Sequence, residues 1–244
     1  MWGDLFMISK YKKTIAMSIA LICVIMVSLF GVTKIAQKSK LTSALPQNNK
    51  LCVIIDAGHG GMDGGAVGVD GIVEKDINLS IALKLKDMME LNGIDVIMTR
   101  NTDISIHDEE LTSTREQKVS DIHNRLALAD ENPNAIFISI HQNKFEKASS
   151  SGAQVFYSPN NPESASLAQA MQRTIKEAIQ QENEREIKQS GSNLYILHNT
   201  KNTAIMVECG FLSNASDAAL LTDDEYQSKM AYSIFAGLVR YFAV

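Results

Sequence analysis

The 244-residue chain has few cysteines and lacks the glycine patterns that bind nucleotide phosphates. Its three cysteines are too few and too scattered for a disulfide framework. Cys23 lies in an apolar segment, and Cys52 and Cys209 lie in predicted strands, where cysteine is usually a small buried hydrophobe. The glycines between residues 58 and 71 do not follow Gly-x-Gly-x-x-Gly, and no Gly-Lys-Ser/Thr follows them. The sequence therefore argues against a disulfide scaffold and a phosphate-cradling loop.

The chain also lacks positive charge outside its N-terminal region. Residues 1–40 hold six lysines and one aspartate, a net charge of +5. The whole chain carries −5, which leaves −10 on the other 204 residues. A surface of that sign is poor for binding a phosphate backbone. We therefore expect no nucleic-acid partner.

The N-terminal region predicts a membrane segment. Residues 1–13 are basic, and residues 14–32 form an uncharged run of 19, which is about the length that spans a hydrocarbon core. A cleaved signal peptide is the alternative, but Thr33-Lys34-Ile35-Ala36 is a poor cleavage site. An uncleaved anchor is favoured. Positive charge on both flanks leaves its orientation undecided. Residues 33–49 predict a linker, and residues 50–244 a single domain.

Hydrophobic patterns in that domain alternate between strands and helices. Together they predict an α/β fold with a mostly parallel, mixed sheet that has helices on both faces. The segment 182–193 is expected to be a polar loop, and Thr222-Asp-Asp-Glu225 resembles the capping box of a last helix. The expected strands are 51–56, 94–99, 135–140, 154–157, 194–197 and 203–207. The expected helices begin near 74, 117, 162 and 222, and the second carries an apolar stripe of Val119, Ile122, Leu126 and Ala129.

Two predicted strands run into His59 and His141, and a third ends at Glu208. The ends of neighbouring strands converge on one edge of an α/β sheet, so these side chains can meet. Glu74 opens the helix after the His59 loop, where the helix dipole favours an ionised carboxylate. Two histidines and one glutamate form a common set of three zinc ligands, with the fourth position left for water. Glu208 is then available for proton transfer. Each residue alone also has a purely structural explanation, and the metal site is favoured only because all of them are present.

Other polar residues have weaker cases. Arg115, Arg125 and Asn143 are candidate contacts to substrate or to the ligands. His198 follows a short predicted strand and is a further candidate for substrate binding, although a structural role is favoured. Strand alternation turns Cys209 to the opposite face from Glu208, which argues against a thiol nucleophile.

Four motifs in order resemble the zinc-dependent N-acetylmuramoyl-L-alanine amidases, the amidase 3 family, over residues 51–242. They are Asp56-Ala-Gly-His59-Gly-Gly, Glu74-Lys-Asp-Ile-Asn-Leu, Ser139-Ile-His141-Gln-Asn143 and Val207-Glu208-Cys-Gly210-Phe-Leu-Ser-Asn214. The resemblance implies one zinc ion on His59, Glu74 and His141, and Glu208 as the catalytic acid and base. It implies peptidoglycan as substrate, cut between the lactyl group of N-acetylmuramic acid and L-alanine.

Further segments are similar to a spore-cortex branch of this family. They are the N-terminal anchor, Val96-Ile-Met-Thr-Arg100-Asn-Thr-Asp103 and Ser151-Gly-Ala-Gln-Val-Phe-Tyr157. The branch implies a sporulating Gram-positive source and a role in making muramic-δ-lactam. The N-terminal apolar segment favours a catalytic domain that is membrane-anchored or exported, and with the cortex role it would face the forespore cortex space. Some members of the family need a partner to order the site, so an accessory activating protein is also expected. One departure is Lys201-Asn202-Thr203, where the family commonly has proline.

Two other functions stay open at this point. One is a housekeeping amidase for cell separation or wall turnover. The other is a non-catalytic peptidoglycan-binding protein on the same fold. The lack of a wall-binding repeat disfavours the first, and the intact set of four motifs disfavours the second.

Overall fold

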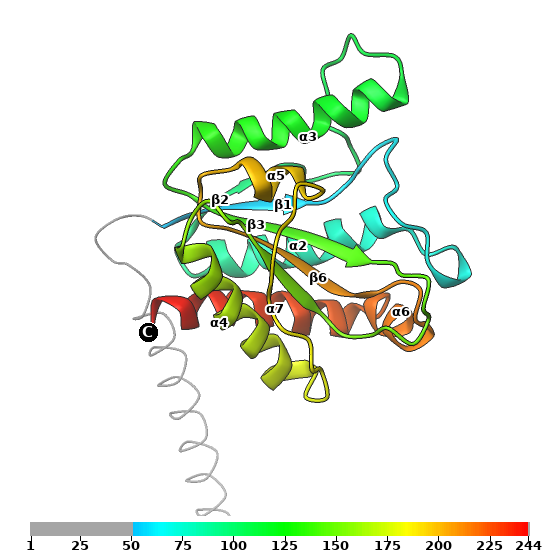
Figure 1. Cartoon of the computed structure of the whole chain (residues 1–244), viewed down its shortest axis with the longest axis vertical. Coiled ribbons are helices and arrows are strands. Elements are labelled where there is room, and N and C mark those ends of the chain that lie inside the picture. The colour runs from blue at the N-terminus through cyan, green and yellow to red at the C-terminus, as the bar shows by residue number, and fades with distance from the viewer. Residues whose placement is uncertain (1–50, 244) are drawn as a thin grey trace, which may run out of the picture. The chain divides into compact units, whose positions relative to one another are not determined.

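A computed structural model describes residues 51–243 of the chain, drawn in colour in Figure 1. Strands and helices alternate through most of it. In chain order the elements are β1 (Cys52–Ala57), η1 (Val69–Gly71), α2 (Glu74–Glu90), β2 (Asp95–Met98), α3 (Thr114–Glu131), β3 (Ile136–Asn143), β4 (Gln154–Tyr157), α4 (Glu163–Ile179), β5 (Lys188–Gln189), α5 (Tyr195–Asn199), β6 (Ala204–Phe211), α6 (Ala215–Leu221) and α7 (Asp224–Phe242).

The strands form one six-stranded sheet in the order β2-β1-β3-β6-β4-β5. Strands β2, β1, β3 and β6 are mutually parallel, and β4 is antiparallel to β6. The prediction of a mostly parallel, mixed sheet is confirmed. The register pairs His141 of β3 with Glu208 of β6. These two residues are therefore direct neighbours across two central strands.

Helices cover both faces of the sheet, as predicted. Figure 1 shows α3 and α5 on one side and α2, α4 and α7 on the other. On the α3 side, Ile54, Phe137 and Met206 of the sheet pack against Ala129 of α3 and Leu197 of α5. Because side chains alternate along a strand, Asp56, His141 and Glu208 face the same side. Asp56, His141 and Glu208 therefore lie on the α3 side of the sheet.

Two segments differ from the prediction. Residues 194–197 were expected to be a strand, but α5 lies there, with Leu197 buried and Tyr195 39% exposed. A four-residue apolar run does not distinguish the two, and here only one face of the run has a core to contact. The expected polar loop 182–193 contains β5, a two-residue edge strand paired with β4.

Other differences concern where elements begin and end. Strand β6 continues to Phe211, so Glu208 lies inside the strand rather than at its end. Helix α3 starts at Thr114, because the side chain of Ser113 caps it by accepting from Glu116 N at 3.2 Å. The predicted Thr222 cap was wrong. Thr222 closes α6, and Asp223 caps α7 by accepting from Tyr226 N at 2.7 Å.

The apolar residues predicted on α3 are buried only in part: Ala129 packs in the core, but two of the others are exposed. Val119 and Ile122 are 48% and 38% exposed, whereas Ser120, Asp121 and Arg125 are buried. Among residues 51–243 no helix is both long enough and apolar enough to cross a membrane. The predicted membrane segment 14–32 lies outside the described residues.

Candidate metal centre and active site

His59 follows β1 in a left-handed backbone conformation, with φ of 62°. Non-glycine residues seldom adopt this conformation, and it is held here by the surrounding loop. Two glycines leave room for the ligand side chains. A Cβ on Gly58 would lie 2.2 Å from Nε2 of His141, and a Cβ on Gly65 would lie 2.6 Å from Oε2 of Glu74. The glycine-rich loop is therefore needed for close approach of the backbone to the two other candidate ligands.

Glu74 is the first residue of α2 and is 3% exposed. Its two carboxylate oxygens have different partners. Oε2 accepts from the backbone N–H of Ala66 at 2.8 Å, and Oε1 accepts from the backbone N–H of Gln142 at 3.1 Å. Backbone donors of this kind favour the ionised carboxylate. Glu74 is thus fixed between the His59 loop and the end of β3.

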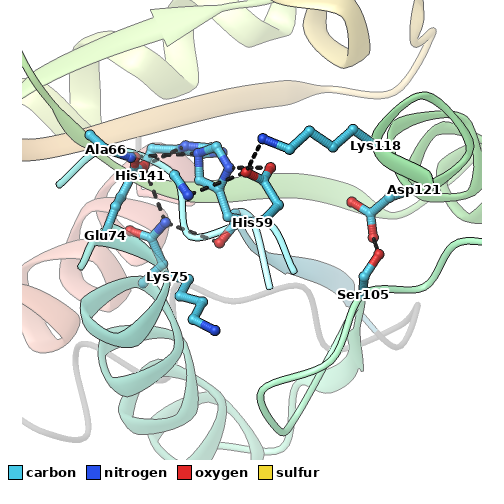
Figure 2. Close-up of polar contacts among 12 residues, drawn as sticks. His59, Ala66, Glu74, Lys75, Ser105, Lys118, Asp121 and His141 are labelled. Atoms are coloured by element: carbon cyan, nitrogen blue, oxygen red, sulfur yellow. Dashed lines mark hydrogen bonds and ion pairs between the residues drawn. The ribbon is translucent and has the colours of Figure 1, made fainter. Parts of the chain in front are cut away.

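His59, Glu74 and His141 converge on one point. His141 Nδ1 lies 2.9 Å from Glu74 Oε1, and His59 Nε2 lies 3.3 Å from Glu74 Oε2. One ligand atom from each residue lies within 4.8 Å of the other two. Ligands about 2.1 Å from a tetrahedral ion are about 3.4 Å apart, so this spacing fits a metal ion after small adjustments. Figure 2 shows the three side chains pointing toward one another.

A second layer of charge surrounds His59. Its Nδ1 lies 2.7 Å from Asp63 Oδ2, and Lys118 of α3 forms an ion pair with Asp63 Oδ1 at 2.7 Å. Figure 2 shows Lys118 reaching toward the His59 loop. A carboxylate on the outer nitrogen of a histidine fixes the ring orientation and leaves the other nitrogen for a metal.

The electrostatic surroundings favour a cation. Burial opposes protonation of His59, but hydrogen bonds to Asp63 and Glu74 outweigh it and raise the pKa of His59 to about 9. Burial also works against ionisation of Glu74, yet hydrogen bonds to His141 and His59 hold the pKa of Glu74 well below its usual range. Positive charge at this point is therefore stabilised, whether it is a proton or a metal ion.

Glu208 lies beside His141 and has a different environment. Its Oε2 is buried and has no hydrogen-bond partner within the described residues. Burial, with a smaller contribution from the charge of Glu74 and against the effect of His141, raises the pKa of Glu208 to about 7. A carboxyl group that titrates near neutral pH can both accept and donate a proton.

Arg125 is 2% exposed and supports the His59 loop from α3. It donates to Asp56 Oδ1 at 2.5 Å, to the carbonyl of Ala57 at 2.9 Å and to the carbonyl of His59 at 2.8 Å. Asp121 pairs with its Nε at 2.6 Å. Of the two roles considered for Arg125, its contacts correspond to support of the ligands.

The other candidates for substrate binding are dispersed. Asn143 ends β3, two residues after His141, and is half-buried. Arg115 is exposed and lines a cavity on α3 that includes none of the three candidate ligands. His198 is exposed in the last turn of α5 and is absent from the residues that line the cavity at the ligands. Only Asn143 is therefore adjacent to the cluster in the chain.

A small cavity of about 170 Å³ lies against His59 and His141. Arg125 and Asp121 of α3 also line it. Its apolar walls come from Ile122 of α3, from Leu194, Tyr195 and Ile196, and from Met206 of β6, none of which carried a functional prediction. The lining is largely apolar. This wall was not predicted, because residues 194–197 were expected to form a strand, and a strand there would have been part of the sheet.

The one departure from the family pattern has a structural explanation. Asn202 is 2% exposed, and its side-chain amide donates to the carbonyls of Asn132 and Ala135, both at 2.8 Å. These bonds fix the turn that leads into β6. Asparagine contacts thus hold a turn where proline would restrict the backbone.

Comparison with known proteins gives the family. The family model for N-acetylmuramoyl-L-alanine amidase matches residues 53–240. The germination-specific N-acetylmuramoyl-L-alanine amidase of Bacillus subtilis is 35% identical over 199 residues, which cover 82% of each chain. The CwlD amidase from Clostridioides difficile, solved in complex with the GerS lipoprotein, is 41% identical. It has a TM-score of 0.75, and the match covers 79% of this chain and 98% of that one.

A third relative is the N-acetylmuramoyl-L-alanine amidase AmiC2 of Nostoc punctiforme. It is 29% identical with a TM-score of 0.66, over 79% of this chain and 97% of that one. The family match extends over most of the chain and includes the candidate ligands His59, Glu74 and His141, and also Glu208. The chain therefore belongs to the amidase 3 family of N-acetylmuramoyl-L-alanine amidases, and it is a peptidoglycan amide hydrolase with a His–Glu–His cluster able to hold a metal ion.

Proposed function

We propose that this amidase is zinc-dependent, that Glu208 is its proton-transfer residue, and that it acts in making the spore cortex. The observation that carries the proposal is the juxtaposition of two features. Three ligand atoms lie within 4.8 Å of one another, and the neighbouring strand presents a carboxyl group with an unpartnered buried oxygen. Such a carboxyl group is costly to bury and is typical of functional sites.

His59, Glu74 and His141 would hold the zinc ion. Nitrogen ligands favour zinc over magnesium or calcium, and a set of three leaves one position open. Zinc bound there supplies a Lewis acid for the scissile carbonyl and increases the acidity of water. Asp63 keeps the His59 ring oriented, because its carboxylate holds Nδ1.

Glu208 moves the proton. In its ionised form it accepts a proton from the attacking water, and it then donates that proton to the amine nitrogen of the departing L-alanine. The carbonyl carbon gains the water oxygen and loses the amine, so the products are a lactyl carboxylate and a free stem peptide. The apolar cavity beside His59 and His141 suits the methyl groups that flank this amide bond.

Metal analysis tests the chemistry. The purified full chain is expected to contain one zinc per molecule, and a chelator is expected to abolish cleavage of isolated cell wall until zinc is restored. Glu208→Ala should keep the zinc and lose the cleavage. A folded protein without stoichiometric zinc, or a fully active Glu208→Ala variant, would refute the proposal.

The cortex role rests on the two similar proteins named for germination and as CwlD, at 35% and 41% identity. In this role the catalytic domain, residues 50–244, lies outside the cytoplasm and follows an anchor at residues 14–32 in the chain. Muropeptide analysis of spores that lack the protein distinguishes this role from wall turnover. Loss of muramic-δ-lactam is expected, and an unchanged content contradicts the cortex role.

An accessory protein is part of the proposal, because the CwlD amidase was solved in complex with a lipoprotein. Cleavage of isolated wall by the purified chain should increase when extract of sporulating cells is added. Equal activity with and without extract would argue against an activating partner.

A further inference from the structure

Asn78 contacts all three segments that carry the candidate ligands. It lies one turn after Glu74 on α2 and is 0% exposed. Its Nδ2 donates to the carbonyl of Gly58 at 3.1 Å and to Glu74 Oε1 at 3.3 Å. Its Oδ1 accepts from Nε2 of Gln142 at 3.1 Å. Gly58 precedes His59 and Gln142 follows His141, so one amide links the loop, the helix and the strand.

Arg100 makes a second connection between two of these segments. It follows β2 and is 2% exposed. One nitrogen, NH2, donates to the carbonyl of Gly58 at 3.0 Å and to the carbonyl of Lys75 at 2.8 Å. Its Nε donates to the carbonyl of Ala57 at 2.8 Å. The guanidinium therefore ties the residue before His59 to the residue after Glu74.

Arg100 is also unusual in its charge balance. Arg125 is paired with Asp56 and Asp121, whereas Arg100 forms no ion pair within residues 51–243. Its described hydrogen bonds go to four backbone carbonyls, of which the fourth is that of Thr102 at 3.1 Å. Burying a guanidinium without an ion pair is costly unless its donors are satisfied, and here the four carbonyls, with the nearby charges of Asp56, Asp103 and Asp121, offset that cost.

We propose that Asn78 and Arg100 are positioning residues that set the affinity of the His59–Glu74–His141 site for its metal ion. The proposal rests on the function proposed above. The three ligands come from a loop, a helix and a strand, and His59 has a left-handed backbone. Without these connections each segment would be free to relax away from the point where the ligand atoms meet. Both side chains are buried, so neither is a substrate contact.

The test compares Asn78→Ala with Asn202→Ala in the full chain, purified in mild detergent. Both changes remove a buried side-chain amide that donates two hydrogen bonds. Asn202, however, lies before the first residue of β6, away from the ligands, and donates to the carbonyls of Asn132 and Ala135. Zinc affinity is measured by competition with a chromophoric chelator. Asn78→Ala should raise the zinc Kd about 10- to 100-fold, the usual effect of removing a support of metal ligands. Asn202→Ala should leave the Kd unchanged when unfolded protein is discounted.

Arg100→Lys provides a second variant in case Asn78→Ala does not fold. Lysine keeps the charge but cannot bridge the carbonyls of Gly58 and Lys75 in the same fork. Arg240→Lys on α7, whose guanidinium pairs with Glu177, is its control. The visible spectrum of the cobalt(II)-loaded protein should change in Arg100→Lys and not in Arg240→Lys, because it reports the coordination geometry.

The outcomes separate the two proposals. If the unaltered chain binds zinc tightly, Asn78→Ala binds it as tightly as Asn202→Ala, and the cobalt(II) spectra of Arg100→Lys and Arg240→Lys are the same, the positioning role is wrong and the zinc site stands. If the unaltered chain binds no zinc, the proposed function fails, and this inference fails with it.

Discussion

Replacing Arg125 with methionine should destabilise the fold in a way that depends on pH. Methionine keeps much of the apolar stem, so packing is largely preserved, but the change removes the charge next to Asp56. Asp56 is 1% exposed and would keep only the hydroxyl donors of Ser139 at 2.6 Å and Thr99 at 2.9 Å. The carbonyls of Ala57 and His59 would each lose a donor.

The size of the loss in unfolding free energy follows from these contacts. Removing one partner of a buried ion pair costs about 3–5 kcal/mol. Two hydroxyl donors remain on Asp56, and Asp121 keeps its bonds from Ser105 and from the backbone N–H of Ile106. We therefore expect the lower end, about 3 kcal/mol at pH 7. For a domain of this size that is a fall in Tm of about 6–12 °C.

The pH dependence has a definite sign. Burial works to raise the pKa of Asp56, but Arg125, His141 and Ser139 outweigh it and lower the pKa. In the native protein Asp56 therefore contributes stability above its unfolded pKa of about 3.9, and that stability is lost as pH falls through the lower folded value. Without Arg125 the largest lowering contribution is lost, so the pKa of Asp56 is higher in the variant than in the native protein. The stability difference between the two proteins should be largest at pH 7 and should shrink as pH falls toward about 4.

The measurement is urea unfolding of the full chain in mild detergent at several pH values. Arg115→Met, an exposed position on the same helix, is the control and should stay within about 0.5 kcal/mol. Asp56→Asn completes a double-mutant cycle, in which Arg125→Met should cost less once the buried charge is gone. A loss below about 1 kcal/mol, or one that is equal at pH 7 and at acid pH, would show that the pair does not carry the stability assigned to it.

Three further predictions concern the site. Gly65→Ala should weaken zinc binding far more than Gly71→Ala; both glycines have a positive φ, of 69° and 79°, but only a Cβ at 65 meets Glu74 and His59, so equal zinc affinities would contradict the close-approach explanation. The rate of wall cleavage should rise with pH as Glu208 ionises, with a midpoint at or below about 7 because a bound zinc ion favours the carboxylate, and a pH profile without that limb would contradict Glu208 as the base. Tyr195→Ala should raise KM more than Tyr232→Ala, which alters an exposed tyrosine on α7; equal KM values would remove Tyr195 from the substrate site.

Hydrophobic patterns predicted the central strands because those strands are buried on both faces. Runs such as Val53–Ile55 leave no alternative to a central position, and their carboxyl ends then fall on one edge. That is enough to bring His59 and His141 together without knowledge of any side-chain contact. Short amphipathic segments such as α5 could not be predicted in the same way. Whether such a segment forms a helix or a strand depends on the parts of the fold that it packs against.

The residues that support the ligands could not be predicted from the sequence for a different reason. Asn78 stands four residues after Glu74 and shares its helix face, but nothing local indicates that Gly58 and Gln142 will approach that face. Asp63 stands four residues after His59 in a loop, where the spacing of two residues does not indicate whether their side chains face each other. Their roles depend on segments far away in the chain.

The error on α3 identifies the site better than the correct predictions do. A helix that packs on a sheet is expected to bury its apolar residues, yet α3 exposes Val119 and Ile122 and buries Asp121 and Arg125. Arg125 lies over the end of β1, where Asp56 and the carbonyls of the His59 loop need donors, and Asp121 accepts from its guanidinium. At the first turn of α2 Glu74 is buried for a related reason. Where a helix buries charged residues in place of apolar ones, the fold is satisfying buried polar groups instead of packing a core. Here Glu74 is itself a candidate ligand, and Arg125 supports the loop that carries His59.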